Sequence, residues 1–224
     1  LAEAELCEAR HLADLIGIRH RMVDTRELSD PRYAANPGNR CYFCKSELFG
    51  RLIPIARREG LRHVIYGAIP DDLSDHRPGH AAAVELGIRS PLQDAELTKA
   101  EIRTLSKENG LPTWDKPAMA CLASRIPHGH RVTAEKLRAV DKAEAHLRAL
   151  GFRQLRVRHH GVVARIEVDA GEVSRFFDSV LLDDVSETLR GFGFPALSVD
   201  LRGYRTGSLN RIPIPLPVLI SADP

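Results

Sequence analysis

The sequence is poor in aromatic residues, in cysteine and in net charge. Among 224 residues only 5% are Phe, Trp or Tyr, four are Cys, and 32 Lys and Arg nearly balance 30 Asp and Glu, for a formal charge of +2. A chain with so little net charge and so few stacking side chains does not have the composition of a nucleic-acid-binding protein, and we expect no such partner. Four unevenly spaced cysteines also argue against a secreted disulfide scaffold.

Long apolar runs are absent as well. No stretch approaches the ~20 apolar residues that a helix needs to span a bilayer, and no segment resembles a signal peptide. We therefore expect a cytoplasmic protein without a membrane partner. The hydrophobic fraction of 43% and the charged fraction of 28% are ordinary for a globular protein that holds one large or two small domains.

Alternating helical and strand patterns in residues 1–128 predict an α/β domain, a parallel sheet with helices on both faces. In such sheets ligands bind beyond the carboxyl ends of the strands, where the loops with Cys41, Gly67 and Cys121 are expected to gather. The first helix follows no strand, which is typical of the middle of such a domain, so we expect residues upstream of Leu1. The predicted helices cover residues 2–17, 44–60, 80–86 and 98–109, and the predicted strands cover 18–24, 62–67 and 88–92.

The pattern changes after residue 128 and predicts a small α+β domain over residues 129–211. The prediction comprises a helix over 133–150, strands over 152–159 and 162–168, helical stretches over 171–178 and 181–191, and a strand over 196–201. The tail, residues 212–224, has proline at every second position from Pro213 to Pro217, which excludes a regular helix or a central strand. It is predicted to be an arm along another subunit or a disordered segment.

Three cysteines are the strongest chemical feature. Cys41 and Cys44 form a C-x-x-C pair and Cys121 lies far downstream. Three thiolates on one metal or cluster leave one position open for chemistry. The alternatives are a redox dithiol, which would not need Cys121, a structural zinc with His128 or His130 as fourth ligand, and inert apolar packing. Cys7, in an apolar helical pattern, is predicted to be a core residue.

Arginines form the second feature. Arg156 and Arg158 are two residues apart on a predicted strand, so both emerge on one face. Arg205 lies in a glycine-flanked loop, Gly203 to Gly207, and the three together suit phosphate or carboxylate. A solvated charged strand is the alternative. Glu144, on the preceding helix, is expected to face them or to be exposed.

Two further groups suggest a nucleotide. Lys45 follows Cys44 at the predicted start of a helix, where a lysine and the helix dipole can both attract a triphosphate. Asp71, Asp72 and Asp75 could hold Mg²⁺, although acidic loop residues are more often simply solvated.

Four segments in this order resemble the LarE family: Arg40–Lys45, Asp75–Gly79, Trp114–Gly129 and Leu155–His159. The resemblance runs from about Leu1 to Asn210. It implies a PP-loop ATP pyrophosphatase fold and an ATP-dependent sulfur transferase of nickel-pincer cofactor biosynthesis, in the maturation of lactate racemase.

The implied reaction adenylates a carboxylate of pyridinium-3,5-biscarboxylic acid mononucleotide with ATP and Mg²⁺, and sulfur then displaces AMP to give a thiocarboxylate. Some members sacrifice a cysteine of their own. Others have three cysteines at the places of Cys41, Cys44 and Cys121 and bind a 4Fe-4S cluster, and this sequence is similar to those.

The resemblance also implies roles for single residues. It places Lys45 and Gly67 near ATP and implies a homo-oligomer. The serine-glycine-glycine pyrophosphate loop of PP-loop enzymes is not present in the sequence, so the resemblance implies that it precedes Leu1. A PP-loop tRNA thiolase and a non-enzymatic zinc-stabilised nucleotide-binding module remain alternatives. The implied catalytic residues are Cys121, Ser124, Arg125 and Glu144, and the implied substrate-binding residues are Arg156, Arg158 and Arg205.

Overall fold

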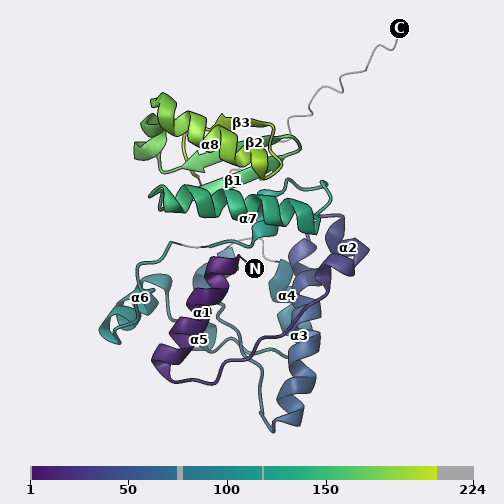
Figure 1. The fold of residues 1–224 in the computed structure, drawn as a ribbon. Helices are drawn as coiled ribbons and strands as arrows, with labels where there is room; N and C mark the ends of the chain where they lie inside the picture. Colours follow the sequence, from purple (N-terminus) through teal and green to yellow (C-terminus); the bar gives the residue numbers. More distant parts are fainter. Residues whose placement is uncertain (1, 75–77, 118, 206–224) are drawn as a thin grey trace.

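The structure, a computed structural model, describes residues 2–74, 78–117 and 119–205. A helical part, residues 2–117, lies below a sheet part, residues 134–205, in Figure 1. The helices are α1 Glu3–Ile16, α2 Pro31–Ala34, α3 Arg40–Arg58, α4 Pro78–Glu85, α5 Pro91–Asp94, α6 Lys99–Glu108, α7 Ala134–Ala149 and α8 Ser179–Gly191. Short 3-10 helices are η1 Glu27–Ser29, η2 Pro70–Ser74, η3 Leu122–Arg125 and η4 Ala170–Phe177.

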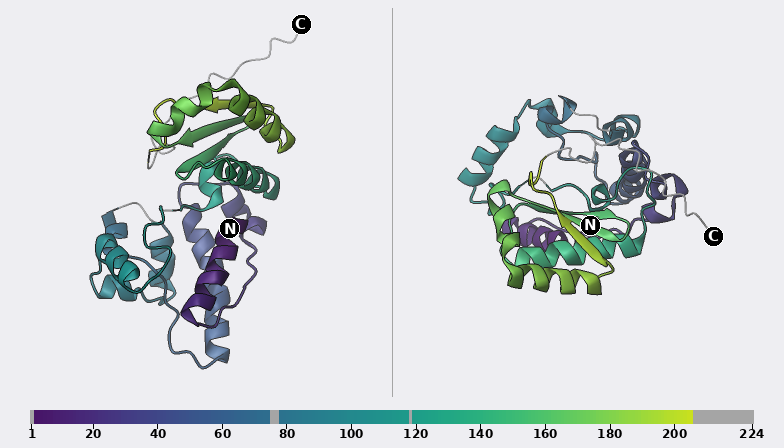
Figure 2. Two further views of the ribbon diagram at one scale, coloured as in Figure 1. Left: turned by 60° about the vertical axis from the view of Figure 1, so that its left-hand side comes forward. Right: turned by 90° about the horizontal axis from the view of Figure 1, so that it is seen from above.

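The sheet part has two layers. Strands β1 Leu155–His160 and β2 Val163–Val168 form an antiparallel hairpin that turns at Gly161, and β3 Ala196–Val199 pairs with β2 in parallel. Helices α7 and α8 cover one face of this sheet (Figures 1 and 2). The order of helix, hairpin, helical stretches and strand agrees with the sequence pattern, except that the first helical stretch is the 3-10 helix η4.

Side-chain alternation decides which face is covered. Val157 and Ile166 are fully buried with Val140 and Leu147 of α7 and Val185 of α8 in one hydrophobic cluster. Arg156 and Arg158 of β1, and Arg165 and Glu167 of β2, alternate with these apolar residues along the strands. They lie on the opposite face, because successive strand residues alternate between faces. The hairpin therefore has an apolar face for the core and a polar face free of helices α7 and α8.

The helical part differs from the sequence prediction. In the part of the chain that the structure describes, the predicted strands over 62–67 and 88–92 reduce to one parallel bridge between Ile65 and Arg89, and residues 18–24 form no strand. Strands of parallel sheets are usually buried on both faces, whereas Ile65 is 61% exposed here. The mixed α/β character holds, and the PP-loop parallel sheet stays a prediction.

Three helix ends agree with the predicted ranges. Gly17 ends α1 with φ 78°, Thr98 and Glu101 form the capping box of α6, and the Thr133 side chain accepts a hydrogen bond from Lys136 N at the start of α7. Two predictions were wrong. Helix α3 begins at Arg40, ahead of both Cys41 and Cys44, and Cys7 is exposed because α1 buries only Ala13 along its length.

The two parts touch through α1. Its N-cap residue Ala2 belongs to the core cluster of the sheet part, and Glu3 N donates a hydrogen bond to Asp141 Oδ2 of α7 at 3.3 Å. Among the described residues no helix has the length and apolarity needed to cross a membrane. The predicted tail over 212–224, the end of the predicted second domain from 206, and Asp75 to Arg77 and Ala118 of the family motifs lie outside the described residues.

The core of the sheet part can be tested at Leu147, which is fully buried on α7. We expect Leu147→Ala to lower the free energy of unfolding by roughly 2–5 kcal/mol, because it leaves a cavity against the sheet. Urea denaturation measures this. Val180→Ala, at a residue that is 77% exposed, is the control, and equal losses in the two variants would contradict the assigned core.

Candidate functional site

Arg40 joins the C-x-x-C helix to the loop with Cys121. It is only 5% exposed, and its Nη1 donates hydrogen bonds to Asn36 Oδ1 at 2.6 Å and to the Ala123 carbonyl oxygen at 2.8 Å. Its Nη2 lies 3.7 Å from Cys121 Sγ. We call residues 119–132 the Cys121 loop. One buried guanidinium thus connects the start of α3 with this loop and reaches its thiol.

Asn36 holds the same loop from its other end. It is fully buried with φ 56°, a backbone conformation that asparagine tolerates better than most residues. Its Nδ2 lies within 3.1 Å of the carbonyl oxygens of Ile126, Pro127 and His130. Sequence reasoning missed both Asn36 and the role of Arg40. An asparagine four residues before an arginine that opens a helix is the local signal that was available.

The three thiols differ in their exposure to solvent. Cys41 and Cys121 are exposed and Cys44 is half-buried. Burial first, then the nearby Glu27 and Cys121, raises the pKa of Cys44 to about 11. Burial therefore keeps the Cys44 thiol protonated at neutral pH.

The described residues contain no group of three or more His, Cys, Asp or Glu side chains placed to hold a metal ion. His128 and His130, the expected alternative zinc ligands, are exposed. Thiolates of three cysteines are the type of donor that iron–sulfur clusters use.

A buried ion pair fixes the Cys121 loop on the sheet part. Arg125 Nε and Nη2 donate to the two carboxylate oxygens of Glu144 on α7 at 2.8 and 3.0 Å, and both side chains are 1% exposed. Arg125 Nη1 donates to the Cys121 carbonyl oxygen at 3.0 Å. Glu144 also accepts from Val157 N of β1 at 3.1 Å. Glu144 therefore contacts Arg125 rather than solvent and links α7, β1 and the loop.

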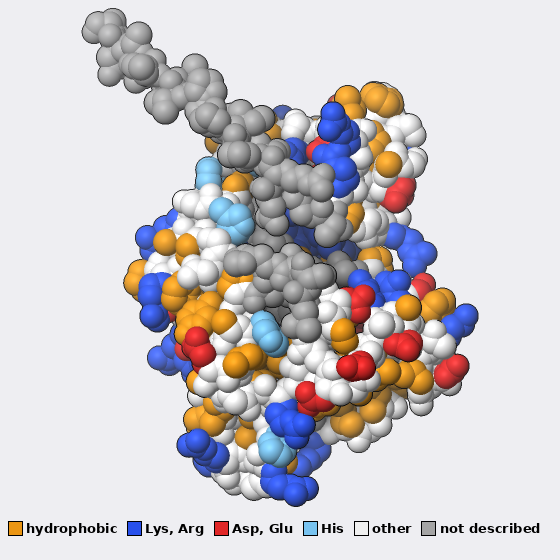
Figure 3. Space-filling view, turned by 180° about the vertical axis from the view of Figure 1, so that it is seen from behind, with side chains coloured by type: hydrophobic (Ala, Val, Ile, Leu, Met, Phe, Trp, Pro, Cys, Tyr) orange, Lys and Arg blue, Asp and Glu red, His pale blue; other side chains and the backbone are white. Residues whose placement is uncertain are grey.

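Arg156 and Arg158 lie on the polar face of the hairpin, beside this ion pair. Arg158 Nη1 donates to the Ser124 carbonyl oxygen at 3.1 Å, and Ser124 Oγ accepts from Arg125 Nη1 at 3.1 Å. Burial and the neighbouring Arg125 charge lower the pKa of Arg156 from its ordinary value. Figure 3 shows Lys and Arg side chains in a hollow between the sheet part and the helical part.

The loop after β3 approaches Arg156 through its aromatic residue. Gly203 has φ 66°, and a Cβ there would be 2.8 Å from the Val168 carbonyl oxygen, so the close approach requires glycine. The ring of Tyr204 lies 5.0 Å from Arg156 Cζ, a cation–π contact that the sequence did not reveal. Arg205, with a side chain that is 43% exposed, has Nη2 3.4 Å from Asp200 Oδ2.

The expected nucleotide residues lie on the helical part. Lys45 is in the second turn of α3, because that helix begins at Arg40, and its Nζ lies over the rings of Phe49 and Tyr66 at 5.6 and 5.9 Å. The premise that Lys45 sits at a helix N-terminus was therefore wrong. Gly67 is exposed, two residues after the bridge residue Ile65.

The acidic loop makes backbone contacts. Asp71 Oδ2 accepts from Lys99 N at 3.1 Å and Asp72 Oδ2 accepts from Ile69 N at 3.2 Å. Asp75, the third expected carboxylate, lies outside the described residues. These contacts agree with a structural role for Asp71 and Asp72.

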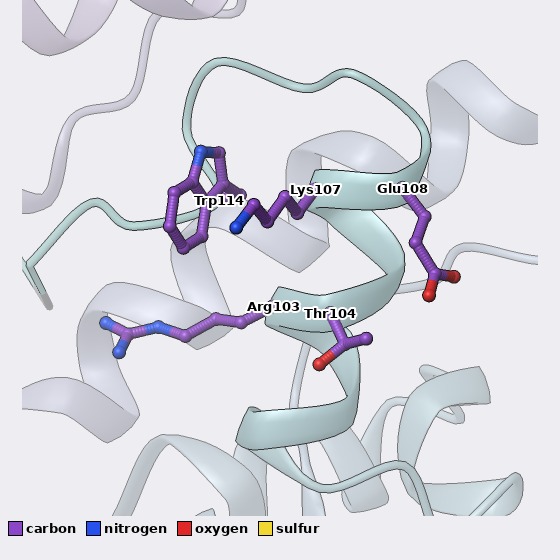
Figure 4. Close-up of a pocket in the computed structure, with 5 residues that line it drawn as sticks. All are labelled: Arg103, Thr104, Lys107, Glu108 and Trp114. Carbon is purple, nitrogen blue, oxygen red and sulfur yellow. The ribbon is translucent and has the colours of Figure 1, made fainter.

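A separate open pocket of about 350 Å³ lies against α6 (Figure 4). Lys107 Nζ lies 4.5 Å from the Trp114 ring centroid there, and Arg103 extends along the same side. None of the expected site residues lines this pocket, so the candidate site is the Cys121 loop with α3 and the hairpin. The lining residues are Arg103, Thr104, Lys107, Glu108 and Trp114.

Known proteins resemble the chain over most of its length. It is 36% identical over 208 residues to pyridinium-3,5-bisthiocarboxylic acid mononucleotide synthase of Lactiplantibacillus plantarum. The aligned residues cover 93% of this chain and 75% of that protein. An uncharacterised Synechocystis protein is 48% identical over 95% of this chain and 79% of its own length. A Methanocaldococcus jannaschii protein, also uncharacterised, is 28% identical over 86% of this chain and 74% of its own length. No protein-family model matches the chain.

The raised pKa of Cys44 predicts slow alkylation of the metal-free chain. At about pH 8, near the ordinary pKa of a thiol, Cys44 should remain protonated and react with iodoacetamide far more slowly than Cys7. Rates come from mass spectrometry of the peptides. The exposed Cys7 is the internal control, and equal rates at the two cysteines would contradict the buried position of Cys44.

The buried amide of Asn36 predicts a second outcome. Asn36→Ala removes one acceptor of Arg40 Nη1 and the side-chain donor to three carbonyl oxygens, and should lower the free energy of unfolding by about 1–3 kcal/mol. Limited proteolysis should then cleave within residues 119–132. Asn109→Ala is the matched control, because the Asn109 side chain also donates to a carbonyl, that of Leu105, but is exposed. A protease-resistant loop in Asn36→Ala would show that Asn36 does not hold it.

Proposed function

Because the chain belongs to the LarE family, that of pyridinium-3,5-bisthiocarboxylic acid mononucleotide synthase, we propose that it converts carboxylates of pyridinium-3,5-biscarboxylic acid mononucleotide to thiocarboxylates. The enzyme is then an ATP-dependent sulfur transferase. The contact that carries the proposal is Arg40 Nη2 at 3.7 Å from Cys121 Sγ, which joins the C-x-x-C helix to the third cysteine.

The chemistry needs an activated carboxylate. A carboxylate is a poor electrophile, so its oxygen attacks the α-phosphorus of ATP, releases pyrophosphate and becomes an acyl adenylate. Sulfur then attacks the acyl carbon and AMP leaves. Mg²⁺ on the phosphates would neutralise the charge that develops there. Lys45 and Gly67 are proposed to lie on the ATP side of the site.

The substrate is proposed to bind on the hairpin side. Arg156 and Arg158 offer forked N–H donors to its anionic groups, and desolvation strengthens such contacts. Arg125 and Glu144 position the loop beside them, since the ion pair is buried and one Arg125 N–H reaches the Cys121 carbonyl oxygen. Ser124 is proposed to contact the substrate through its hydroxyl, and Arg205 to contribute a third guanidinium.

Cys41, Cys44 and Cys121 are proposed to hold a 4Fe-4S cluster with one iron free of protein ligands. When bound, that cluster would supply the sulfur and could be recharged between turnovers. Arg40 supports the arrangement, because an N–H directed at a ligand sulfur stabilises its negative charge. Because Cys41 and Cys121 are exposed, a substrate could approach a cluster held by these cysteines.

Anaerobic reconstitution of the full-length protein tests the proposal. The wild type should turn brown, retain about four irons per chain, and form thiocarboxylate from the pyridinium mononucleotide and ATP. Cys121→Ser should lose sulfur transfer entirely and keep its circular dichroism spectrum.

Cys7→Ser is the matched control, because Cys7 is exposed and outside the proposed set, and it should retain iron and activity. A colourless wild type with one bound zinc would refute the cluster. Unfolding of Cys121→Ser on loss of its ligand would favour a structural metal site instead.

A further inference from the structure

The polar face of the hairpin extends beyond the two expected substrate arginines. Arg158 of β1 is the direct cross-strand partner of Arg165 of β2. His160 lies on the same face of β1 as Arg158, two residues farther along. Like charges directly opposite each other destabilise a sheet, so the Arg158–Arg165 pair requires a compensating anion.

Glu167 supplies part of that compensation. It is fully buried, its Oε2 accepts from Arg158 Nε and Nη2 at 3.0 and 2.8 Å, and its Oε1 accepts from Arg165 Nη2 at 2.6 Å. The polar face nevertheless has three arginines, including Arg156, and one carboxylate. It carries a surplus of positive charge in a place with little water, which favours an anionic ligand.

Two polar atoms on this face lack hydrogen bonds. Arg165 Nε and His160 Nε2 are buried and neither has a partner. Arg165 is the diagonal neighbour of His160, because His160 pairs with Val163 and Arg165 is the next residue on that face. A buried donor without an acceptor is costly, and two adjacent ones beside Arg158 indicate a missing shared acceptor.

We propose that Arg165 and His160, together with Arg158, form a second anion subsite that binds the phosphomonoester of the mononucleotide substrate. This inference rests on the proposed function for the identity of the ligand. A phosphomonoester has three acceptor oxygens and up to two negative charges, so it can accept from all three side chains and offset the surplus charge. A carboxylate carries a single negative charge and offsets less of that surplus.

The side chains are suited to this task. Burial, and then the Arg165 charge, lowers the pKa of His160, so its ring is neutral near pH 7 and can present an N–H at Nε2. The groups that face it are Arg165, His130, Glu167 and Arg158. The Arg165 side chain is 19% exposed, so the proposed subsite borders on solvent.

Calorimetry on the full-length protein without ATP or iron tests the subsite. The probes are nicotinic acid mononucleotide and nicotinic acid riboside, which differ only by the phosphate. Wild type should bind the mononucleotide roughly tenfold tighter or more, the gain expected from charged hydrogen bonds. In Arg165→Gln and His160→Ala this preference should largely disappear, while riboside affinity remains unchanged.

Arg190→Gln is the matched control, because it removes one positive charge from an exposed position of α8, which covers the other face of the sheet. Arg165→Lys keeps the charge but not the Nε donor and should retain only part of the preference; it serves if Arg165→Gln fails to fold. Equal affinities of wild type for the two probes, or an undiminished preference in every folded Arg165 and His160 variant, would overturn the subsite. Sulfur transfer is measured separately, so its loss or retention does not affect this result.

Discussion

The buried hydrogen-bond network of Asn36 and Arg40 is the constraint on which the candidate site depends. Cys41 and Cys44 lie on α3, and among the described residues no strand pairing joins that helix to the loop with Cys121. A buried amide and a buried guanidinium must find acceptors, and here these are carbonyl oxygens of the Cys121 loop. The position of that loop against α3 is therefore set by the need to satisfy these two side chains.

A second polar network connects the same loop to the sheet part. Arg125 and Glu144 bridge the loop and α7. Arg158, which pairs with Glu167 inside the hairpin, donates to the Ser124 carbonyl oxygen of the loop. Breaking such a pair by removing one partner leaves an uncompensated buried charge and typically costs about 3–5 kcal/mol. The loop thus contacts two polar networks, one on α3 and one on the sheet part. Together these contacts fix the position of the Cys121 thiol relative to the arginines of the hairpin.

Features coded by neighbouring residues could be predicted from the sequence. The capping box at Thr98, helix α7 and the hairpin depend on patterns within a few residues. The predicted parallel sheet over residues 18–92 depends on pairing between distant segments, and among the residues of that range that the structure describes only the Ile65–Arg89 bridge occurs. The same reason applies to the site. The spacing singled out Cys41, Cys44 and Cys121, whereas Asn36 and Arg40 act through carbonyl oxygens that are 83 to 94 residues away.

The geometry of the hairpin also suggests how a ligand would be oriented. Arg156 and His160 are four residues apart on β1, which corresponds to about 13 Å along a strand. A small single anion cannot contact both ends of such a row, whereas a mononucleotide with its phosphate toward His160 can extend its ring toward Arg156. That end lies beside Arg125, whose Nη1 binds the Cys121 carbonyl oxygen. Phosphate recognition at the far end would therefore direct the carboxylates toward the thiols, so substrate specificity and sulfur delivery would share one polar face.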